Sequence, residues 1–195
     1  MWPPRGYGYH CGPAVKKAER QVSLNGLRKS WRQALSPKTL RGCSLLHIFI
    51  DADACPVKQE VYRVAKRYDL GVTLVAGSWM RVPEENNLAL KVVGEGMDAA
   101  DDWIVEHVEV DDIVITADIP LAARCLEKTA YALGHTGKPF TKENIGAALA
   151  TRDLLSALRD FGEVVGGPPP FDKRDRSRFL HQLDEMINTI QRKGA

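Results

Sequence analysis

Two aspartates end a short apolar run in the stretch HIFIDADACPVK, residues 47–58. In an extended strand, the side chains of Asp51 and Asp53 would point to the same side because the two residues are two positions apart. Neighbouring carboxylates repel each other unless a cation lies between them or one of them is protonated. The structural alternative is that Asp51 and Asp53 cap a helix that begins at Pro56, since Asp is a favoured residue before a helix.

Acidic residues also follow other predicted elements. Asp118 ends a predicted strand at 112–118, and the segment GMDAADDWI brings Asp98 and either Asp101 or Asp102 to one face of a helix. Each of these acids alone could be a helix cap or a solvated surface residue. In a parallel sheet, however, ligands gather at the carboxyl ends of the strands. Carboxylate oxygens suit Mg²⁺ or Mn²⁺ better than zinc, so the pattern predicts a divalent-cation site suited to phosphodiester hydrolysis.

Basic and polar residues near these acids are candidates for substrate contacts. Lys58, Arg81 and Arg152 could bind phosphate, although isolated cations are more often ordinary surface charges. Thr116 could bond a ligand or simply favour a strand. Trp79 lies beside Arg81 in a loop, but we expect Trp79 to be a packing residue and not a base-stacking platform.

The order of the predicted elements indicates an α/β fold with a mainly parallel sheet. Apolar runs predict the strands, and helical spacing or capping residues predict the helices. The predicted strands are 45–50, 72–76, 88–93, 112–118 and 131–133. The predicted helices begin at Pro56 and Asp98 and continue with 119–128, 141–162 (capped by Thr141) and 172–193. Loops are predicted at 77–87 and 166–171.

Composition is typical of a globular, non-membrane protein. Of 195 residues, 44% are hydrophobic and 27% are charged, and no apolar run approaches the roughly 18 residues that a membrane span needs. The first residues lack the apolar core of a secretory signal. The four cysteines, Cys11, Cys43, Cys55 and Cys125, have no metal-binding spacing, so we expect reduced thiols in a cytoplasmic protein.

Charge is distributed unevenly along the chain. Residues 1–44 contain nine Lys or Arg residues and one acid, a net charge of +8, and residues 45–195 then carry −6 of the total of +2. We predict that residues 1–44 are a basic, disordered N-terminal extension and that 45–195 form a single domain. The alternatives for the extension are a nucleic-acid-binding arm and a transit-like segment.

Several motifs, in order, resemble one known family. They are DADACPVK, RVP, GMDAADDWIVE, VITADIPLA, TKENI, the RD at 152–153, GGPPPF and RDR. Together they are similar to the YaiI/YqxD family of uncharacterised bacterial proteins, from about His47 to Gln191. The segment GHTGKPF resembles a local variant of the family's loop before TKENI. This family has no established activity to carry over.

At a greater distance, the chain resembles the PIN-like nuclease superfamily. There an acid follows the first strand, other acids lie on a central helix, and Thr-x-Asp closes a later strand. Asp51, then Asp98 with Asp101 or Asp102, then Thr116-Ala117-Asp118 match this pattern. The resemblance implies a three-layer PIN-like fold, with a mainly parallel central sheet flanked by helices. It also implies cleavage of RNA, or of flap-like DNA, with Mg²⁺ or Mn²⁺.

The same resemblance assigns roles to individual residues. Asp51, Asp98 and Asp118 are the implied catalytic metal ligands, and Asp53 and Asp102 would complete the metal site. The expected substrate contacts are Lys58, Arg81, Thr116 and Arg152. The expected partner is RNA or another nucleic acid, with no membrane association.

Two other functions fit parts of the sequence. One is a haloacid-dehalogenase-like phosphatase, in which Asp51 would be the nucleophile and Asp53 the acid/base. The usual residue after the second Asp is replaced there by Ala54, and the later motifs of that class are not clear. The other is a non-catalytic PIN-like binding protein, although a charge of −6 on residues 45–195 opposes unaided binding to polyanions.

Overall fold

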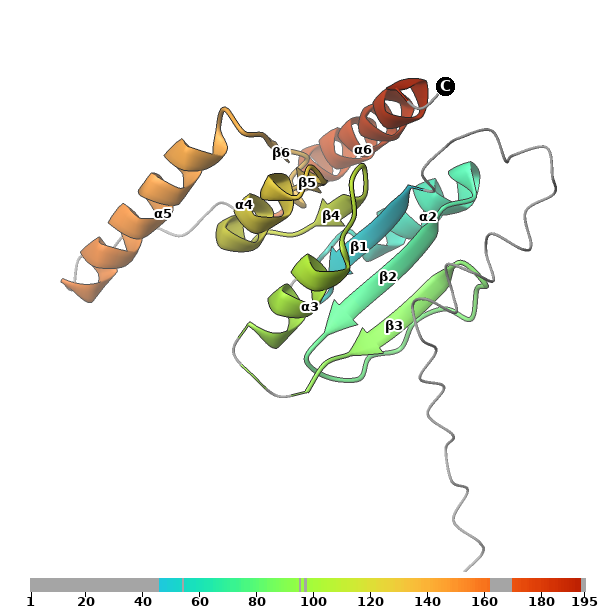
Figure 1. Cartoon of the computed structure of the whole chain (residues 1–195), viewed down its shortest axis with the longest axis horizontal. Helices are drawn as coiled ribbons and strands as arrows, with labels where there is room; N and C mark the ends of the chain where they lie inside the picture. Colours follow the sequence, from blue (N-terminus) through green and yellow to red (C-terminus); the bar gives the residue numbers. More distant parts are fainter. Residues whose placement is uncertain (1–45, 54, 95, 97, 162–169, 194–195) are drawn as a thin grey trace, which may run out of the picture. The chain divides into compact units, whose positions relative to one another are not determined.

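The computed structural model describes residues 46–53, 55–94, 96, 98–161 and 170–193 (Figure 1). The predicted extension at 1–44, Cys11, Cys43 and most of the predicted loop at 166–171 lie outside the described residues. Within the described residues the chain forms six strands and five helices. The strands are β1 (His47–Asp51), β2 (Gly71–Ala76), β3 (Leu88–Val92), β4 (Ile113–Ile115), β5 (Tyr131–Leu133) and β6 (Pro139–Phe140). The helices are α2 (Lys58–Tyr68), α3 (Ala99–His107), α4 (Ile119–Glu127), α5 (Ile145–Asp160) and α6 (Lys173–Lys193).

All six strands form one sheet in the order β3-β2-β1-β4-β5-β6. The first five are parallel to their neighbours, and β6 alone is antiparallel, to β5. Ile48 of β1 lies beside Val72 of β2 on one side and Ile113 of β4 on the other. The central strands are almost entirely apolar because helices cover both faces of a parallel sheet.

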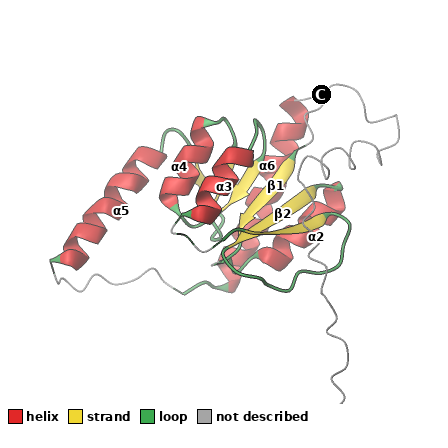
Figure 2. Cartoon of the chain, turned by 60° about the horizontal axis from the view of Figure 1, so that its bottom comes forward, coloured by secondary structure: helices red, strands yellow, loops and turns green. Residues whose placement is uncertain are grey.

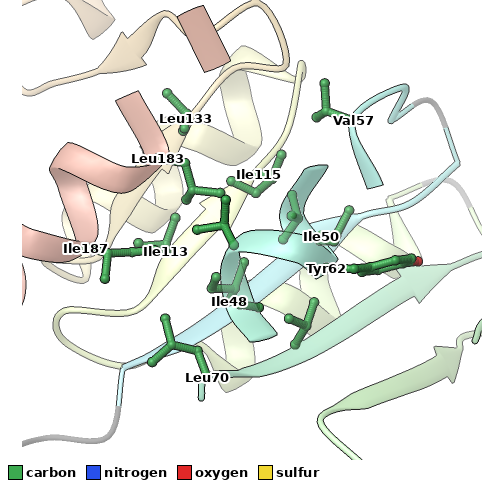
Figure 3. Packing of buried hydrophobic residues seen from close by; sticks show 14 of the residues in the cluster. Ile48, Ile50, Val57, Tyr62, Leu70, Ile113, Ile115, Leu133, Leu183 and Ile187 are labelled. Carbon is green, nitrogen blue, oxygen red and sulfur yellow. The ribbon is translucent and has the colours of Figure 1, made fainter. Parts of the chain in front are cut away.

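The alternation of side chains along β1 divides the core between two helical layers. Ile48 and Ile50 pack on one side of the sheet with α2 and α6, including Leu183 of α6 (Figure 3). Phe49 points to the other side and packs in the cluster that contains Ile104 of α3 and residues of α4. Figure 2 shows α3 and α4 together on one side of the strands. The prediction of a three-layer α/β fold with a mainly parallel sheet is therefore confirmed.

Several elements differ from the sequence predictions, and four of these differences are informative. β4 ends at Ile115, so Thr116 and Asp118 follow the strand instead of lying in it. α2 begins at Lys58 and not at Pro56, and the short strand β6 was not predicted. α5 begins at Ile145 because Thr141 and Asn144 first form a turn, in which the Thr141 N–H donates to Asn144 Oδ1 at 3.0 Å.

The structure also bears on the predictions about the cysteines and about membrane-spanning segments. Cys55 and Cys125 are free thiols, and burial raises the pKa of Cys55 to about 11 and that of Cys125 to about 12. Neither thiol is therefore activated as a nucleophile. Among the described helices, none has the length and apolar character that crossing a bilayer requires.

Gly137 fixes the turn between β5 and β6 against α6. Its φ of +78° lies in the left-handed region, and a Cβ atom there would lie 2.5 Å from the backbone nitrogen of Phe179. We expect Gly137→Ala to lower the free energy of unfolding by about 2 kcal/mol or more, because neither backbone can move without disturbing the core.

The matched control is Gly146→Ala in α5, where an added Cβ would meet no atom within 4 Å. Because Ala is the better helix former, this change should be neutral or stabilise the protein by up to about 1 kcal/mol. Urea unfolding of both variants measures the difference. Equal stability of the two variants would contradict the tight turn.

Candidate functional site

The candidate site lies at the carboxyl ends of the central parallel strands. β1 has β2 on one side and β4 on the other, so the connections that leave β1 and β4 diverge at this edge. Such a switch point leaves a crevice outside the strand ends, which is where ligands bind in open α/β sheets. Asp51 closes β1, and Thr116 and Asp118 follow β4.

Thr116 joins the ends of β1 and β4. Its hydroxyl donates to Asp51 Oδ2 at 2.9 Å and accepts a hydrogen bond from the backbone N–H of Asp118, also at 2.9 Å. Thr116 is buried, so both contacts are shielded from water. The structure therefore uses Thr116 to position Asp51.

Asp118 also begins a helix. Its Oδ1 atom accepts a hydrogen bond from the N–H of Leu121 at 2.9 Å and so caps α4, with Pro120 in the first turn. The interpretation of Asp118 as a helix cap is confirmed. Within the described residues, Oδ2 of Asp118 accepts no hydrogen bond, so this atom can take a ligand while Oδ1 keeps the cap.

Asp53 connects the loop after β1 to the end of β2. Its Oδ2 atom accepts a hydrogen bond from the N–H of Gly77 at 3.0 Å. The alternative that Asp51 and Asp53 cap the next helix is wrong, because α2 has Val57 at its N-cap and no side-chain capping bond. Asp51 instead accepts a hydrogen bond from Thr116, and Asp53 accepts one from Gly77.

The two acidic candidates in the first turn of α3 have different surroundings. Burial, together with the negative charges of Asp118, Asp51 and Asp98, raises the pKa of Asp101 to about 6. Asp102 instead forms an ion pair with Arg124, 2.7 Å from Oδ1 to Nη2, and its side chain is 59% exposed. The structure thus brings Asp101 to the other acids and pairs Asp102 with Arg124.

Asp98 precedes α3 in an unusual conformation. Its φ of +66° is left-handed, and its exposed side chain makes no capping bond, although it occupies the N-cap position. Asp tolerates this conformation better than most residues because its short polar side chain fits the left-handed region. Asp98 acts on the cluster through the effect of its charge on Asp101.

The cluster is electrostatically unfavourable as it stands. Burial raises the pKa of Asp51, and so do the charges of Asp53 and Asp118, while the hydrogen bond from Thr116 acts in the opposite direction. Within the described residues, no group of three or more His, Cys, Asp or Glu side chains is arranged to hold a metal ion. The carboxylates are therefore near one another without being drawn into a shared ligand geometry.

A groove of about 1070 Å³ leads away from Asp118. Its lining includes Lys138 from the β5–β6 turn and Arg152 and Arg159 from α5. Arg152 was predicted to contact substrate, and the structure places it in a groove that begins at the acidic cluster. The nearby cations would attract a polyanion to this side of the site.

His135 is a potential site residue that the sequence analysis missed. It lines the groove and also a second, small cavity whose walls include Asp51 and Thr116. Its ring packs against Phe171, with 5.9 Å between the ring centroids. The available signal was its position just after a buried strand, the same signal that identified Asp118.

Lys58 and the loop after β2 lie on the other side of the cluster. The ammonium group of Lys58 donates to the carbonyl of Ala52 at 2.6 Å and to Met80 Sδ at 3.7 Å, so it holds this loop in place. Arg81 is exposed. Trp79 was predicted to be a packing residue; it is 69% exposed and does not lie in the core.

Comparisons with known proteins agree with the motifs. A family model described as "Uncharacterized BCR, YaiI/YqxD family" matches residues 49–189. A "UPF0178 protein" of Rhodopseudomonas palustris (strain TIE-1) is 55% identical over 152 residues, covering 78% of this chain and 96% of the relative. Another, from Bradyrhizobium sp. (strain ORS 278), is 54% identical over 148 residues, covering 76% of this chain and 90% of the relative. No solved structure matches the chain.

Replacing Asp101 tests the repulsion within the cluster. Because the fold raises the pKa of Asp101 from 3.8 to about 6, ionising this group destabilises the folded state as pH rises through this interval. Asp101→Asn should therefore stabilise the metal-free protein above pH 6, by about 1 kcal/mol after screening by solvent. The difference should disappear near pH 3.8 and below.

Asp102→Asn is the matched control, since it removes a neighbouring charge that is paired with Arg124. It should be neutral or slightly destabilising at every pH. Urea unfolding in EDTA between pH 4 and pH 8 measures both variants. A destabilising effect of Asp101→Asn at pH 8 would show that this carboxylate is not repelled by its neighbours.

Proposed function

Since the chain belongs to the uncharacterised YaiI/YqxD family of bacterial proteins, we propose an activity from its site: a divalent-metal-dependent nuclease that hydrolyses phosphodiester bonds, with RNA as the favoured substrate. One observation carries this proposal. At the switch point of the sheet, burial and the negative charge of Asp118 raise the pKa of both Asp51 and Asp101, and a groove lined in part by Lys138, Arg152 and Arg159 begins at Asp118. The proposal places the activity in the cytoplasm, as expected from the sequence.

The donor chemistry of this cluster fits Mg²⁺ or Mn²⁺. All of the candidate ligands are carboxylates, and their mutual repulsion is what a bound divalent cation would relieve. Asp51, Asp101 and Asp118 would hold the ion, with Asp98 close by. When bound, the ion would lower the pKa of a coordinated water and stabilise the leaving oxygen. Because these side chains do not yet form a ligand group, the proposal requires them to move together on binding.

The surrounding residues have distinct roles in this proposal. Thr116 keeps one oxygen of Asp51 directed toward β4. The N–H of Gly77 holds the Asp53 side chain at the end of β2. Arg152, with Lys138 and Arg159, would bind the phosphates that flank the cleaved bond. In this proposal Asp102 does not bind the metal but forms an ion pair with Arg124. Lys58 does not contact substrate but holds the loop after β1 through the carbonyl of Ala52.

Replacement of Asp118 tests the catalytic role. Asn caps helices as well as Asp does, so Asp118→Asn should keep the bond to Leu121 and the stability of α4 while removing one charge. We expect Mn²⁺-dependent cleavage of a fluorescent single-stranded RNA to fall at least about 100-fold, a loss typical of removing one electrostatic contact in an active site. Thermal unfolding should be nearly unchanged.

Asp160→Asn, an exposed acid at the end of α5, is the control and should leave cleavage intact. Direct Mn²⁺ titration of the wild type and of Asp51→Asn provides a readout that does not depend on activity. Retained cleavage in Asp118→Asn would remove this residue from the mechanism. Failure of the wild type to bind Mn²⁺ would overturn the metal-dependent proposal and leave a phosphatase or a binding protein.

Arg152 tests the role of the groove. In the inactive Asp118→Asn background, Arg152→Ala should weaken binding of an RNA oligonucleotide, because a phosphate contact is lost. The salt dependence of log Kd should fall by about one unit of slope for that contact. Arg192→Ala, an exposed arginine at the end of α6, is the control and should change neither quantity. Fluorescence anisotropy at several salt concentrations makes the measurement, and identical slopes for the two variants would exclude Arg152 from the binding path.

A further inference from the structure

The segment that follows β2 presents an aromatic ring and a cation together. Trp79 is 69% exposed and Arg81 is also exposed, whereas Met80 and Val82 between and after them pack against the core. Trp79 and Arg81 are therefore both directed to solvent, while the residues between and after them face the protein. Because one residue separates Trp79 from Arg81, their Cα atoms lie at most about 7 Å apart.

Two contacts hold this segment beside the acidic cluster. The N–H of Gly77 donates to Asp53 Oδ2 at 3.0 Å, and the ammonium group of Lys58 donates to Met80 Sδ at 3.7 Å. Trp79 lies between these two anchored residues in the chain. The exposed ring is therefore tied to the loop that carries Asp53, on the β2 side of Asp51.

We propose that Trp79 and Arg81 bind one nucleotide of a single-stranded polynucleotide. The indole ring would stack on an unpaired base, and the Arg81 guanidinium would contact the adjacent phosphate. Aromatic side chains stack on any base because every base has a π-face, and a nearby cation adds phosphate attraction. A duplex cannot use this site in the same way, because its bases are already stacked inside the helix.

The position of this pair also defines the length of the substrate. The strand order puts the Trp79 segment after β2 and the groove that contains Lys138 and Arg152 beyond β4 and β5. β2 and β5 are three strand spacings apart, about 14 Å, with Asp51 between them. A ligand that reaches both sides must be a polymer of several nucleotides whose phosphate at the acidic cluster is internal. This step rests on the proposed nuclease function, whereas the stacking site does not.

The first experiment compares three substitutions of Trp79 in the full chain, in the Asp118→Asn background and in EDTA. The probe is a 12-nucleotide single-stranded RNA, measured by fluorescence anisotropy beside the same sequence in a duplex. Loss of one base-stacking contact should raise Kd for the single strand about 5- to 100-fold in Trp79→Ala. Trp79→Phe should restore most of the affinity, Trp79→Leu should not, and duplex binding should be unchanged in all three.

Val110→Ala is the control, because Val110 is 55% exposed in the turn before β4, at the opposite edge of the sheet. It should leave single-strand affinity unchanged. Full affinity in Trp79→Leu would replace base stacking with a general apolar contact and overturn the proposal. Equal loss of duplex and single-strand binding would overturn it as well, and so would self-association of the wild type that Trp79→Ala abolishes without any change in RNA binding.

The outcomes separate this inference from the nuclease proposal. If Asp118→Asn leaves metal-dependent cleavage unchanged but Trp79→Ala still weakens single-strand binding, the stacking site is supported and the nuclease proposal is refuted. If cleavage depends on Asp118 and Trp79→Ala changes neither binding nor cleavage, the nuclease proposal is supported and the stacking site is refuted. Single-stranded DNA of the same sequence tells whether the 2′-hydroxyl contributes to recognition.

Discussion

The hydrogen bond from Thr116 to Asp51 depends on the parallel pairing of β1 with β4. Ile50 of β1 lies beside Ile115 of β4, so the next residue in each strand reaches the same edge of the sheet. Asp51 and Thr116 can therefore meet only if the register of these two buried strands is kept. The apolar core on both sides of β1 fixes that register, because a shift by one residue would move Phe49 into the layer occupied by Ile48 and Ile50. The site is thus a consequence of how the sheet packs.

The same edge concentrates charges that oppose folding. Burial and neighbouring carboxylates raise the pKa of both Asp51 and Asp101, which means that the ionised cluster destabilises the native state. The apolar layers on both faces of the sheet offset this electrostatic cost. Fully buried residues such as Ile48, Phe49 and Leu183 each contribute about 1.5–3 kcal/mol by leaving water. Electrostatic strain that is retained in a well-packed fold is common where a charged ligand binds.

The sequence predicted the parts of the structure that depend on local periodicity. Apolar runs gave the central strands, and helical spacing gave α2, α3, α4 and α6 to within a few residues, because these elements bury the faces that the patterns mark. β6 was missed because two residues, Pro139 and Phe140, carry no periodicity and pair only through the turn at Gly137. The choice between Asp101 and Asp102 was equally beyond a local pattern. Both occupy the first turn of α3, and they differ in that Asp101 is partly buried near the other acids, whereas Asp102 pairs with Arg124 on the neighbouring helix.

Exposure is the other property that periodicity could not supply. Trp79 is a large apolar residue of the kind that usually packs in a protein. Its exposure becomes clear only from the structure, where Met80 and Val82 pack against the core and Trp79 does not. Residues 45–195 carry a net charge of −6, which should repel a polyanion as a whole. The positions of individual cations show how such a ligand could still bind. Charge acts locally at the distances of a binding site, since screening limits its reach to about 8–10 Å at ordinary salt. Arg81 on one side of the acids and Lys138 with Arg152 on the other would offer a chain of phosphates two favourable contacts, with the acidic cluster between them. A polymer could use both contacts at once, whereas a single phosphate would meet the repulsion of the acids without the second cationic side.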